Sequence, residues 1–476
     1  MKNAISTLVL LWSLALTSSL AHAQQATVAD TTSSRLAKGA TGVQGFGQQS
    51  GEPSAPEIAA RPTDRDLLPF AASLHGLGID THALFLDFFM ANPTTGVNTG
   101  RSGNSGMLIL GADFDLGKLA GLHGGLLHVE ESFFIFKHNV GTTSSFNGDV
   151  GSYMGAQLPN NLPSNYLSLL SYEQRFIDGR LQIEGGRMNP SRYFALQNCE
   201  NAATCMDPIA QFTAHINPPA FATWGGRVRY AVTDTQFAQL GVFENNFSAT
   251  TTNGFDWKLN NATGTLLMGE YGSKSSFAQQ RLPLTYEFIG FYNTAVQSKP
   301  ALVTTSTRRG TGGAMLRWQK FVWRADGEAS PDPAPRSIAL FGTLSGTPDP
   351  MQPYRAYAEL GTTLFSPFKN RPYDRISAKV SYVRVGRDEL DFQHEGRLLA
   401  GGPDAYTSPN QFRLEIDGHF AVAKGTAVEP FVQYVIHPDT FNNPVSASVP
   451  HRGVVVGLTL IVSLGDLLGI SAPPGR

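Results

Sequence analysis

The feature that most constrains the fold is a strict alternation of apolar and polar side chains in short segments. The clearest case is the segment QFRLEIDGHF, from Gln411 to Phe420. One face of this segment is apolar and the other is polar: Phe412, Leu414, Ile416 and Phe420 against Arg413, Glu415, Asp417 and His419. A repeat of two residues is typical of a β-strand, whose successive side chains point to opposite faces, and does not fit a helix.

Similar segments follow one another from about residue 74 to about residue 463, and turn residues separate them. We count about sixteen, near residues 81–91, 106–115, 122–137, 165–176, 179–188, 223–232, 235–247, 265–272, 283–296, 310–321, 336–344, 354–364, 375–386, 408–421, 427–438 and 451–463. Many reach the roughly 9–11 residues that a transmembrane strand needs. The sequence therefore predicts an all-β fold, a transmembrane antiparallel barrel of about sixteen strands. A secreted sandwich or lectin is the competing all-β fold, but sixteen strands are many for one sandwich.

The connections between these segments alternate in length. Very short ones occur around Asp178, Thr233 and Lys424, and all three follow an even-numbered segment. Most odd-to-even connections are longer, near 138–164, 189–222, 248–264 and 387–407. Short periplasmic turns and long outer loops are the asymmetry expected of an outer-membrane barrel. The connections near 273–282 and 324–335 are longer than this pattern prefers.

The two ends of the chain differ from the barrel. Lys2, an apolar run from Leu8 to Leu16 and the small-residue site at Ala21 to Ala23 predict a signal peptide over residues 1–23. Residues 24–70 precede the barrel as a predicted mobile periplasmic segment, residues 71–464 form the barrel, and residues 465–476 form a C-terminal extension. The last strand does not finish at a terminal aromatic residue, as such barrels usually do.

Composition excludes several classes of protein. No run of about eighteen apolar residues follows the signal peptide, so a helical membrane protein is not expected. A net charge of −2 argues against nucleic-acid binding, which requires a basic patch. The eleven histidines stand outside the motifs of serine and zinc hydrolases, so an enzyme is not expected. We expect no cofactor and no metal.

The polar face of the strands must point into the barrel. A lipid-facing Arg or Lys costs about 2–4 kcal/mol at the bilayer midplane, and three charges on one strand would approach the stability of a small domain. Side chains cannot fill a sixteen-stranded barrel, so water would occupy the lumen and solutes could diffuse through it. The residues placed on this face include Asp113, Glu173, Arg175, Glu184, Arg227, Arg229, Arg317, Arg355, Glu359, Lys379, Arg413 and Glu415. Each could instead be a paired charge that only solvates the wall.

Five segments resemble the carbohydrate-selective porin family, also called the OprB family, and they stand in the family's order. They are GRMNPSRYFALQNCENAATC (186–205), ATWGGRVRY (222–230), SIALFGTLSG (337–346), SPFKNRPYDRIS (366–377) and AVEPFVQYVIHP (427–438). The resemblance extends over about residues 80–463. It implies outer-membrane diffusion of glucose and other sugars through a sixteen-stranded barrel narrowed by inward-folded outer loops. Arginine and glutamate together would donate to and accept from sugar hydroxyls.

The resemblance also points to particular residues. The best matched positions of the pore are Arg187, Arg192, Trp224, Arg227 and Arg229. Trp224 could equally be an anchor at the lipid interface. Strand parity would point Arg187 outward, although it could belong to the adjacent loop.

Cys199 and Cys205, with five residues between them, lie in a predicted outer loop of an exported chain, and we expect a disulfide between them. The expected partners are carbohydrate solutes, outer-membrane lipid and the barrel-assembly machinery. Both a monomer and a homotrimer remain open, and so does the preferred sugar. The alternatives to a sugar channel are a general or non-sugar porin and an adhesin or structural barrel.

Overall fold

The structure is a computed structural model that describes residues 67–135, 143–155, 157–158, 165–194, 201, 203–216, 220–246, 253–259, 262–277, 279–302, 306–325, 335–369 and 371–471. The chain divides into two compact units, residues 1–38 and 39–476, and every described residue belongs to the second. The predicted signal peptide and the predicted mobile segment up to residue 66 lie outside the described residues.

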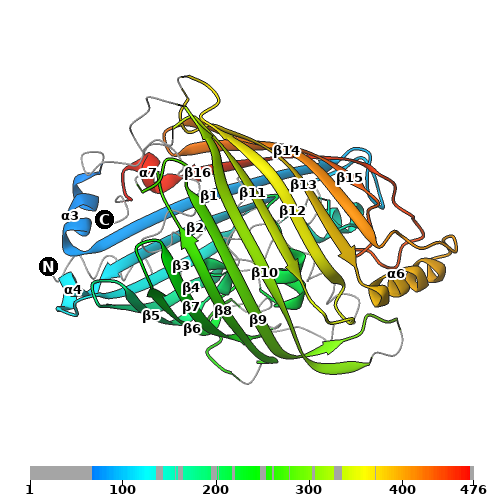
Figure 1. Ribbon diagram of the computed structural model, residues 1–476, viewed down its shortest axis with the longest axis horizontal. Coiled ribbons are helices and arrows are strands. Elements are labelled where there is room, and N and C mark those ends of the chain that lie inside the picture. Colours follow the sequence, from blue (N-terminus) through cyan, green and yellow to red (C-terminus); the bar gives the residue numbers. More distant parts are fainter. Residues whose placement is uncertain are drawn as a thin grey trace. The chain divides into compact units, whose positions relative to one another are not determined.

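The described residues form one closed antiparallel barrel (Figure 1). Its sixteen strands are β1 (Ile79–Asn92), β2 (Arg101–Asp115), β3 (Gly125–Phe134), β4 (Tyr166–Phe176), β5 (Leu181–Met188), β6 (Thr223–Ala231), β7 (Gln236–Asn245), β8 (Gly264–Lys274), β9 (Leu284–Ser298), β10 (Thr307–Arg324), β11 (Ser337–Gly346), β12 (Tyr354–Phe365), β13 (Arg375–Val385), β14 (Asn410–Ala423), β15 (Thr426–Ile436) and β16 (Gly453–Ser463). Each strand pairs with its neighbours in sequence, and β1 closes the ring on β16, with Leu86 opposite Ile461. The predicted fold and all sixteen predicted segments are confirmed.

Burial along the strands shows which face points inward. In β14, Leu414 is 46% exposed and Ile416 is 64% exposed, whereas Arg413 and Glu415 are at most 3% exposed. The apolar side chains therefore cover the outside of the barrel and the polar ones face its interior. This is the arrangement that the cost of a charge in lipid requires.

The two ends of the barrel differ in the connections that they carry. One end carries the tight turns of the β4–β5, β6–β7 and β14–β15 hairpins, together with α3 (Pro69–Leu77), α4 (Leu116–Ala120) and α7 (Leu464–Leu468). The opposite end carries the longer connections and α6 (Arg387–Leu399), as Figure 1 shows. The connections over 275–283 and 325–336 lie at the end with the tight turns, although both are longer than the predicted pattern of short turns prefers. The predicted asymmetry of the loops is confirmed.

Both described ends of the chain meet on the same rim. The backbone N–H of Leu68 donates a hydrogen bond of 2.8 Å to the carbonyl oxygen of Gly469. The Thr81 hydroxyl donates one of 2.6 Å to the carbonyl oxygen of Ile470. The predicted C-terminal extension is thus described up to residue 471, and it lies against the start of β1.

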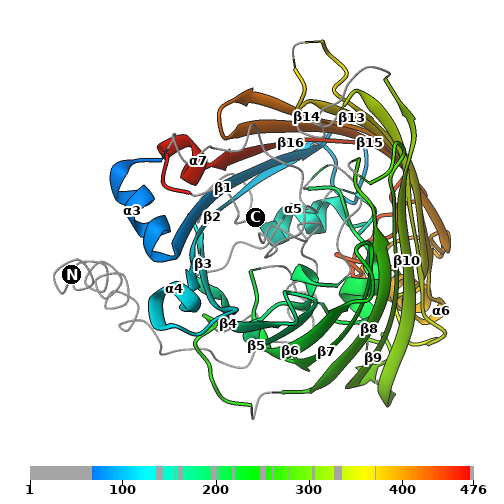
Figure 2. The same ribbon diagram turned by 60° about the vertical axis from the view of Figure 1, so that its left-hand side comes forward.

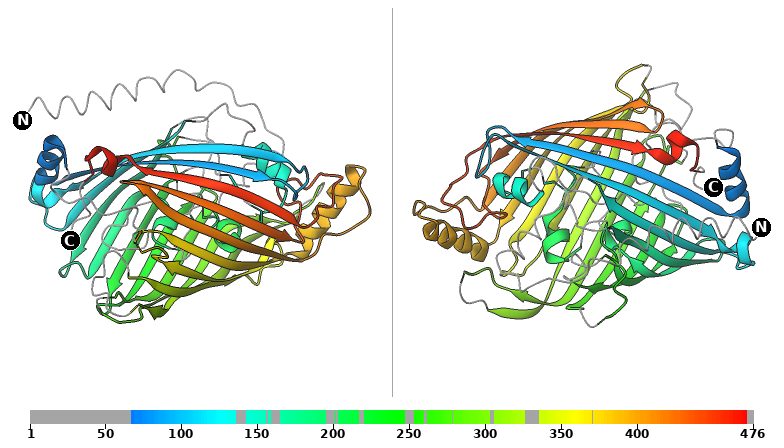
Figure 3. Two further views of the ribbon diagram at one scale, coloured as in Figure 1. Left: turned by 90° about the horizontal axis from the view of Figure 1, so that it is seen from above. Right: turned by 180° about the vertical axis from the view of Figure 1, so that it is seen from behind.

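Two of the long connections fold into the barrel. The β3–β4 connection carries α5 (Thr143–Val150), which lies inside the ring of strands (Figure 2). The β5–β6 connection carries the short helices η2 (Pro190–Arg192) and η3 (Ile209–Thr213), and we call its described residues, 189–194, 201, 203–216 and 220–222, the inner loop. Figure 3 shows from two further sides that α6 stands at the rim of the barrel. The inner loop is the element that positions the site.

Among the described residues, no helix is long and apolar enough to span a bilayer.

Candidate functional site: the inner wall and the inner loop

The inner loop is fixed to the wall of the barrel at widely separated points. On β11, Ser345 Oγ donates a hydrogen bond of 2.9 Å to Asp207 Oδ1. On β9, Asn293 Nδ2 donates to the carbonyl oxygen of Ala214 at 3.3 Å. On β14, the Glu415 carboxylate accepts a hydrogen bond from the Thr204 hydroxyl. Contacts to strands on several sides of the ring hold the loop across the interior.

Asp207 also shapes the loop itself. Its Oδ1 accepts the backbone N–H groups of Ile209, at 2.9 Å, and Ala210, at 3.3 Å, at the start of η3. Aspartate is favoured in this position because it satisfies donors that the helix leaves without an intrahelical partner. Burial raises the pKa of the Asp207 carboxyl above its usual value of 3.8.

An aromatic cluster joins the inner loop to two neighbouring loops. The ring of Phe212 lies with its centroid 4.9 Å from that of Tyr153 and 4.8 Å from that of Phe441. Tyr354, at the start of β12, completes the cluster, 5.2 Å from Phe441. All four side chains are buried. This aromatic cluster packs the three loops together at the long-loop end.

The first group of charges lies on the inner wall around β3, β4, β5 and β6. Arg227 Nε donates to Glu184 Oε2 at 3.0 Å, because the two residues face each other across β5 and β6. The ring of Tyr193, from the inner loop, lies 4.3 Å from the Arg227 guanidinium, and its hydroxyl donates to Glu184 at 2.6 Å. Arg192, also from the loop, pairs with Glu130 of β3. We call this group the β3–β6 cluster; it also contains His128, Glu173 and Arg175, together with Asp113 from the adjacent strand β2.

A second group, the β12–β14 cluster, lies on another stretch of the wall. Lys379 Nζ lies 3.2 Å from Glu415 Oε1, its direct cross-strand partner, and 3.9 Å from Glu359 Oε2. Arg413 lies 3.5 Å from both of these carboxylates. The Lys379 ammonium and the Arg413 guanidinium both donate to the carbonyl oxygen of Thr204, at 3.4 and 3.2 Å. Positive and negative groups therefore alternate in the β12–β14 cluster, and its two cations also hold the inner loop.

A third group joins β8, β9 and β10. Arg317 pairs with Glu287, its cross-strand partner, and Lys274 Nζ lies 3.3 Å from the other oxygen of Glu287. Gln239 Nε2 donates to Glu270 on the same stretch at 2.5 Å. Across all three groups, each cation has an anion beside it. Such a wall offers donors and acceptors together and carries little unbalanced charge.

The structure places nine of the eleven predicted pore-lining residues inside the barrel. Arg192 lies on the inner loop, and the other eight lie on the inward faces of strands: Glu173, Arg175, Glu184, Arg227, Arg229, Arg317, Arg413 and Glu415. Their role in lining the pore stays a prediction.

Arg187 and Trp224 lie elsewhere, and this corrects the prediction for them. They are cross-strand partners, and each stands three positions from an inward-facing residue, Glu184 or Arg227. Because strand side chains alternate, both point away from the interior. Arg187 lies 3.7 Å from Glu244, and its guanidinium carbon lies 5.7 Å from the centroid of the Trp224 ring.

Residues 253–259 of the β7–β8 connection cover this outward patch. Trp224 Nε1 donates to the carbonyl oxygen of Trp257 at 3.2 Å, and the two rings lie 5.8 Å apart. Arg187 is 2% exposed as a result. The Gly–Arg motif of the family resemblance therefore serves the outer wall here, and not the pore.

Of the two cysteines, Cys205 is buried on the inner loop, and Cys199 lies outside the described residues. The disulfide between them stays a prediction.

Three residues of the site were not predicted from the sequence. His128 and Glu130 share the inward face of β3, and the alternation in GLLHVEESFF could have identified them. Tyr193 lies on the inner loop, and no periodic pattern marks it.

Comparisons with known proteins agree with this architecture. Residues 100–464 match the family model described as carbohydrate-selective porin, OprB family. No curated protein sequence matches the chain.

Solved outer-membrane proteins resemble the barrel. The high-pH structure of OprB from Pseudomonas putida has a TM-score of 0.70 at 20% identity, covering 83% of this chain and 96% of that one. The low-pH structure of the same protein has a TM-score of 0.49 at 17% identity, covering 82% and 94%. The channel DcaP of Acinetobacter baumannii has a TM-score of 0.46 at 9% identity, covering 81% and 96%. With the family model matching most of its length, the chain belongs to the OprB family of carbohydrate-selective porins of the outer membrane.

Proposed function

We propose that this outer-membrane porin lets monosaccharides and small oligosaccharides, such as glucose, diffuse passively into the periplasm. The observation that carries the proposal is the inner wall, on which Arg227, Lys379 and Arg413 each lie beside a glutamate. Sugar hydroxyls both donate and accept hydrogen bonds, so paired guanidinium and carboxylate groups suit them. A wall of balanced charge gives a neutral solute no electrostatic penalty.

We assign sugar binding to the stretch of the inner wall where the inner loop meets the β3–β6 cluster. Arg192 and Tyr193 come from the loop, while Glu130, Glu184 and Arg227 come from strands. The tyrosine ring supplies an apolar face and the charged groups supply the hydrogen bonds. A general or non-sugar porin and an adhesin or structural barrel are the alternatives.

Reconstitution tests the proposal. Purified protein in liposomes should cause swelling in glucose and more slowly in sucrose, and gluconate should enter more slowly than glucose. In planar bilayers, millimolar glucose should reduce the ion conductance by occupying the pore. Equal rates for glucose and an uncharged non-sugar of the same size would favour a general porin, and the absence of conductance would favour a structural barrel.

Matched variants locate the sugar contact. Arg192→Met removes a loop charge from the inner wall and should weaken the glucose block severalfold. Arg384→Met alters an exposed arginine at the end of β13 and should leave the block unchanged. If both variants behave as the wild type, the inner loop does not contact the sugar.

Export and assembly belong to the same proposal. Residues 1–23 would be removed as a signal peptide, which N-terminal sequencing of protein from the outer membrane would show by a start at Gln24. The barrel-assembly machinery would then insert the chain, with residues 24–70 and the C-terminal extension 465–476 remaining in the periplasm. Light scattering in detergent distinguishes a monomer from a homotrimer.

A further inference from the structure

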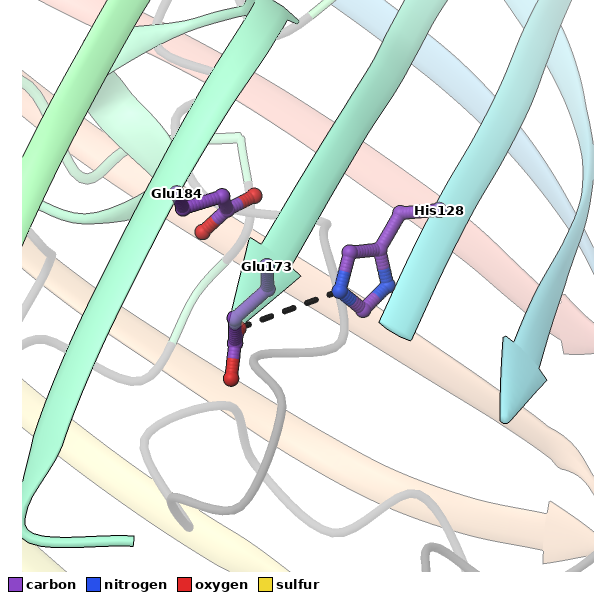
Figure 4. Close-up of side chains that lie close together, drawn as sticks. All are labelled: His128, Glu173 and Glu184. Carbon is purple, nitrogen blue, oxygen red and sulfur yellow. Dashed lines mark ion pairs between the residues drawn. The ribbon is translucent and has the colours of Figure 1, made fainter. Parts of the chain in front are cut away.

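The β3–β6 cluster contains a group of three side chains with the composition of a metal site. The ring nitrogen of His128 and one carboxylate oxygen each of Glu173 and Glu184 lie within 4.8 Å of one another, and all three residues are buried. Figure 4 shows them on adjacent strands, with the imidazole of His128 directed toward the Glu173 carboxylate. The Nε2-to-Oε2 distance between these two groups is 3.8 Å.

The imidazole is oriented as in metalloproteins. His128 Nδ1 lies 2.6 Å from Asp113 Oδ1, at hydrogen-bond distance. A carboxylate on one ring nitrogen fixes the tautomer and leaves the lone pair of the other nitrogen for a metal ion. Among the described residues, no group forms a hydrogen bond with His128 Nε2, although this atom is buried.

The carboxylates of Glu173 and Glu184 repel each other, and a bound cation would reduce that repulsion. Glu173 and Glu184 are direct cross-strand partners on β4 and β5. Like charges in that position destabilise a sheet. Arg175 and Arg227 offset part of this repulsion, with Arg175 Nε 2.5 Å from Glu173 and Arg227 Nε 3.0 Å from Glu184.

With Asp113 the group holds three carboxylates against two guanidinium groups, which leaves one excess negative charge when the imidazole of His128 is neutral. A divalent ion would reverse that excess.

We propose that His128, Glu173 and Glu184 bind a divalent transition-metal ion such as Zn²⁺ on the inner wall of the barrel. One imidazole and two carboxylates form a donor set that suits Zn²⁺. Bonds of about 2.0–2.2 Å would draw the three ligand atoms together from their present spacing. Asp113 acts as the positioning residue, because it holds the imidazole without reaching the ion. Glu184 also belongs to the stretch of wall that we assign to sugar contact, but metal binding by these three side chains does not depend on which solute the porin carries.

Titration of the purified, folded porin tests the site, first with Zn²⁺ by calorimetry and then with Co²⁺ by visible absorption. The wild type should bind one ion, and Co²⁺ should show the absorption of a low-coordinate site. His128→Gln keeps a polar side chain of similar size and should weaken Zn²⁺ binding by at least about tenfold, because it removes the only nitrogen ligand. Glu173→Gln should do the same. Asp113→Asn should weaken binding by about 10–100-fold, the range typical of a lost outer-shell carboxylate.

His451→Ala is the matched control, because His451 is an exposed histidine on the β15–β16 connection. This variant should bind Zn²⁺ within about twofold of the wild type. A second readout is the reversal potential in a KCl gradient. Zn²⁺ should shift the wild-type channel toward anions, and His128→Gln should abolish that shift.

Two outcomes would overturn the proposal. The wild type could fail to bind Zn²⁺ and Co²⁺, in which case a protonated His128 bridges Asp113 and Glu173 and no ion is needed. Alternatively, His128→Gln and Glu173→Gln could bind the ion as tightly as the wild type, which would place binding on surface histidines. Circular dichroism and the electrophoretic shift on heating confirm that each variant is folded before it is titrated.

Discussion

Arg413, on β14, donates a hydrogen bond of 3.2 Å to the carbonyl oxygen of Thr204, a residue 209 positions earlier in the chain. The same guanidinium lies 3.5 Å from Glu359 and from Glu415. A single fully buried side chain thus joins the wall of the barrel to the loop that crosses its interior.

Replacing this arginine should release the loop. Arg413→Met keeps most of the volume but, among the described residues, leaves Lys379 as the one cation beside the two glutamates, and losing one member of a buried pair costs about 3–5 kcal/mol. We expect a lower free energy of unfolding in urea and a larger, noisier single-channel conductance. Arg384→Met, at an exposed site, is the control. An unchanged conductance in Arg413→Met would mean that other contacts hold the loop.

The aromatic cluster gives a second prediction. Phe212→Ala removes the ring that contacts both Tyr153 and Phe441, and such a truncation in a packed core costs about 3–5 kcal/mol. Because the cost falls on loop packing, we expect faster proteolysis within the loops while the barrel stays intact. Phe212→Leu fills part of the space and should show an intermediate rate. Equal rates in all three proteins would contradict this role of the cluster.

The buried carboxyl of Asp207 predicts a pH dependence. Burial raises its pKa above 3.8, so the docked loop binds the proton more tightly than the released loop does. Docking is then favoured below the usual pKa and weakens as the pH rises through the raised value. Single-channel conductance should therefore increase as the pH rises above the usual carboxyl value of 3.8.

The matched variants for this pH dependence differ in burial. Asp207→Asn cannot ionise, so it should flatten the pH profile. Asp404→Asn should not, because the Asp404 side chain is 84% exposed. A profile that Asp207→Asn leaves unchanged would assign the pH dependence to another group.

The ion pair between Arg187 and Glu244, which residues 253–259 cover on the outer wall, gives a fourth prediction. Arg187→Met leaves Glu244 without its arginine beneath Trp224 and Trp257, and we expect a loss of about 3 kcal/mol in the free energy of unfolding. The double variant Arg187→Met, Glu244→Gln removes both charges and should recover part of that loss. If the loss of unfolding free energy in the double variant equals the sum of the losses in Arg187→Met and Glu244→Gln, the two residues are not energetically coupled.

The strands could be predicted from the sequence because the barrel wall requires apolar side chains on its lipid-facing side and allows polar ones on its inner side. Leu414 must face lipid and Arg413 must not, so alternation is visible in β14 from Gln411 to Asp417. The same rule placed Glu184, Arg227 and Arg317 on the inner wall. It also pointed Arg187 outward, and the family resemblance, which placed that residue in the pore, proved the weaker guide.

The inner loop could not be predicted in the same way. Thr204 is held by Lys379 and Arg413, which lie far away in sequence, and Tyr193 by Glu184 and Arg227 of the neighbouring strands. No local period encodes these contacts. The β3–β6 cluster was only partly predicted, since the proximity of His128 to Glu173 depends on the register between β3 and β4. Helix α6 was expected to be a loop, although Arg387 to Leu399 contains residues that favour helices.

The hydrogen bond between Leu68 and Gly469 places both described ends on the rim of the tight turns. An even number of crossings returns the chain to the side from which it entered. A cargo domain fused to either end would therefore stay in the periplasm, whichever end carried it. Surface display would instead require insertion at the opposite rim, where α6 offers an exposed helix in the connection between β13 and β14.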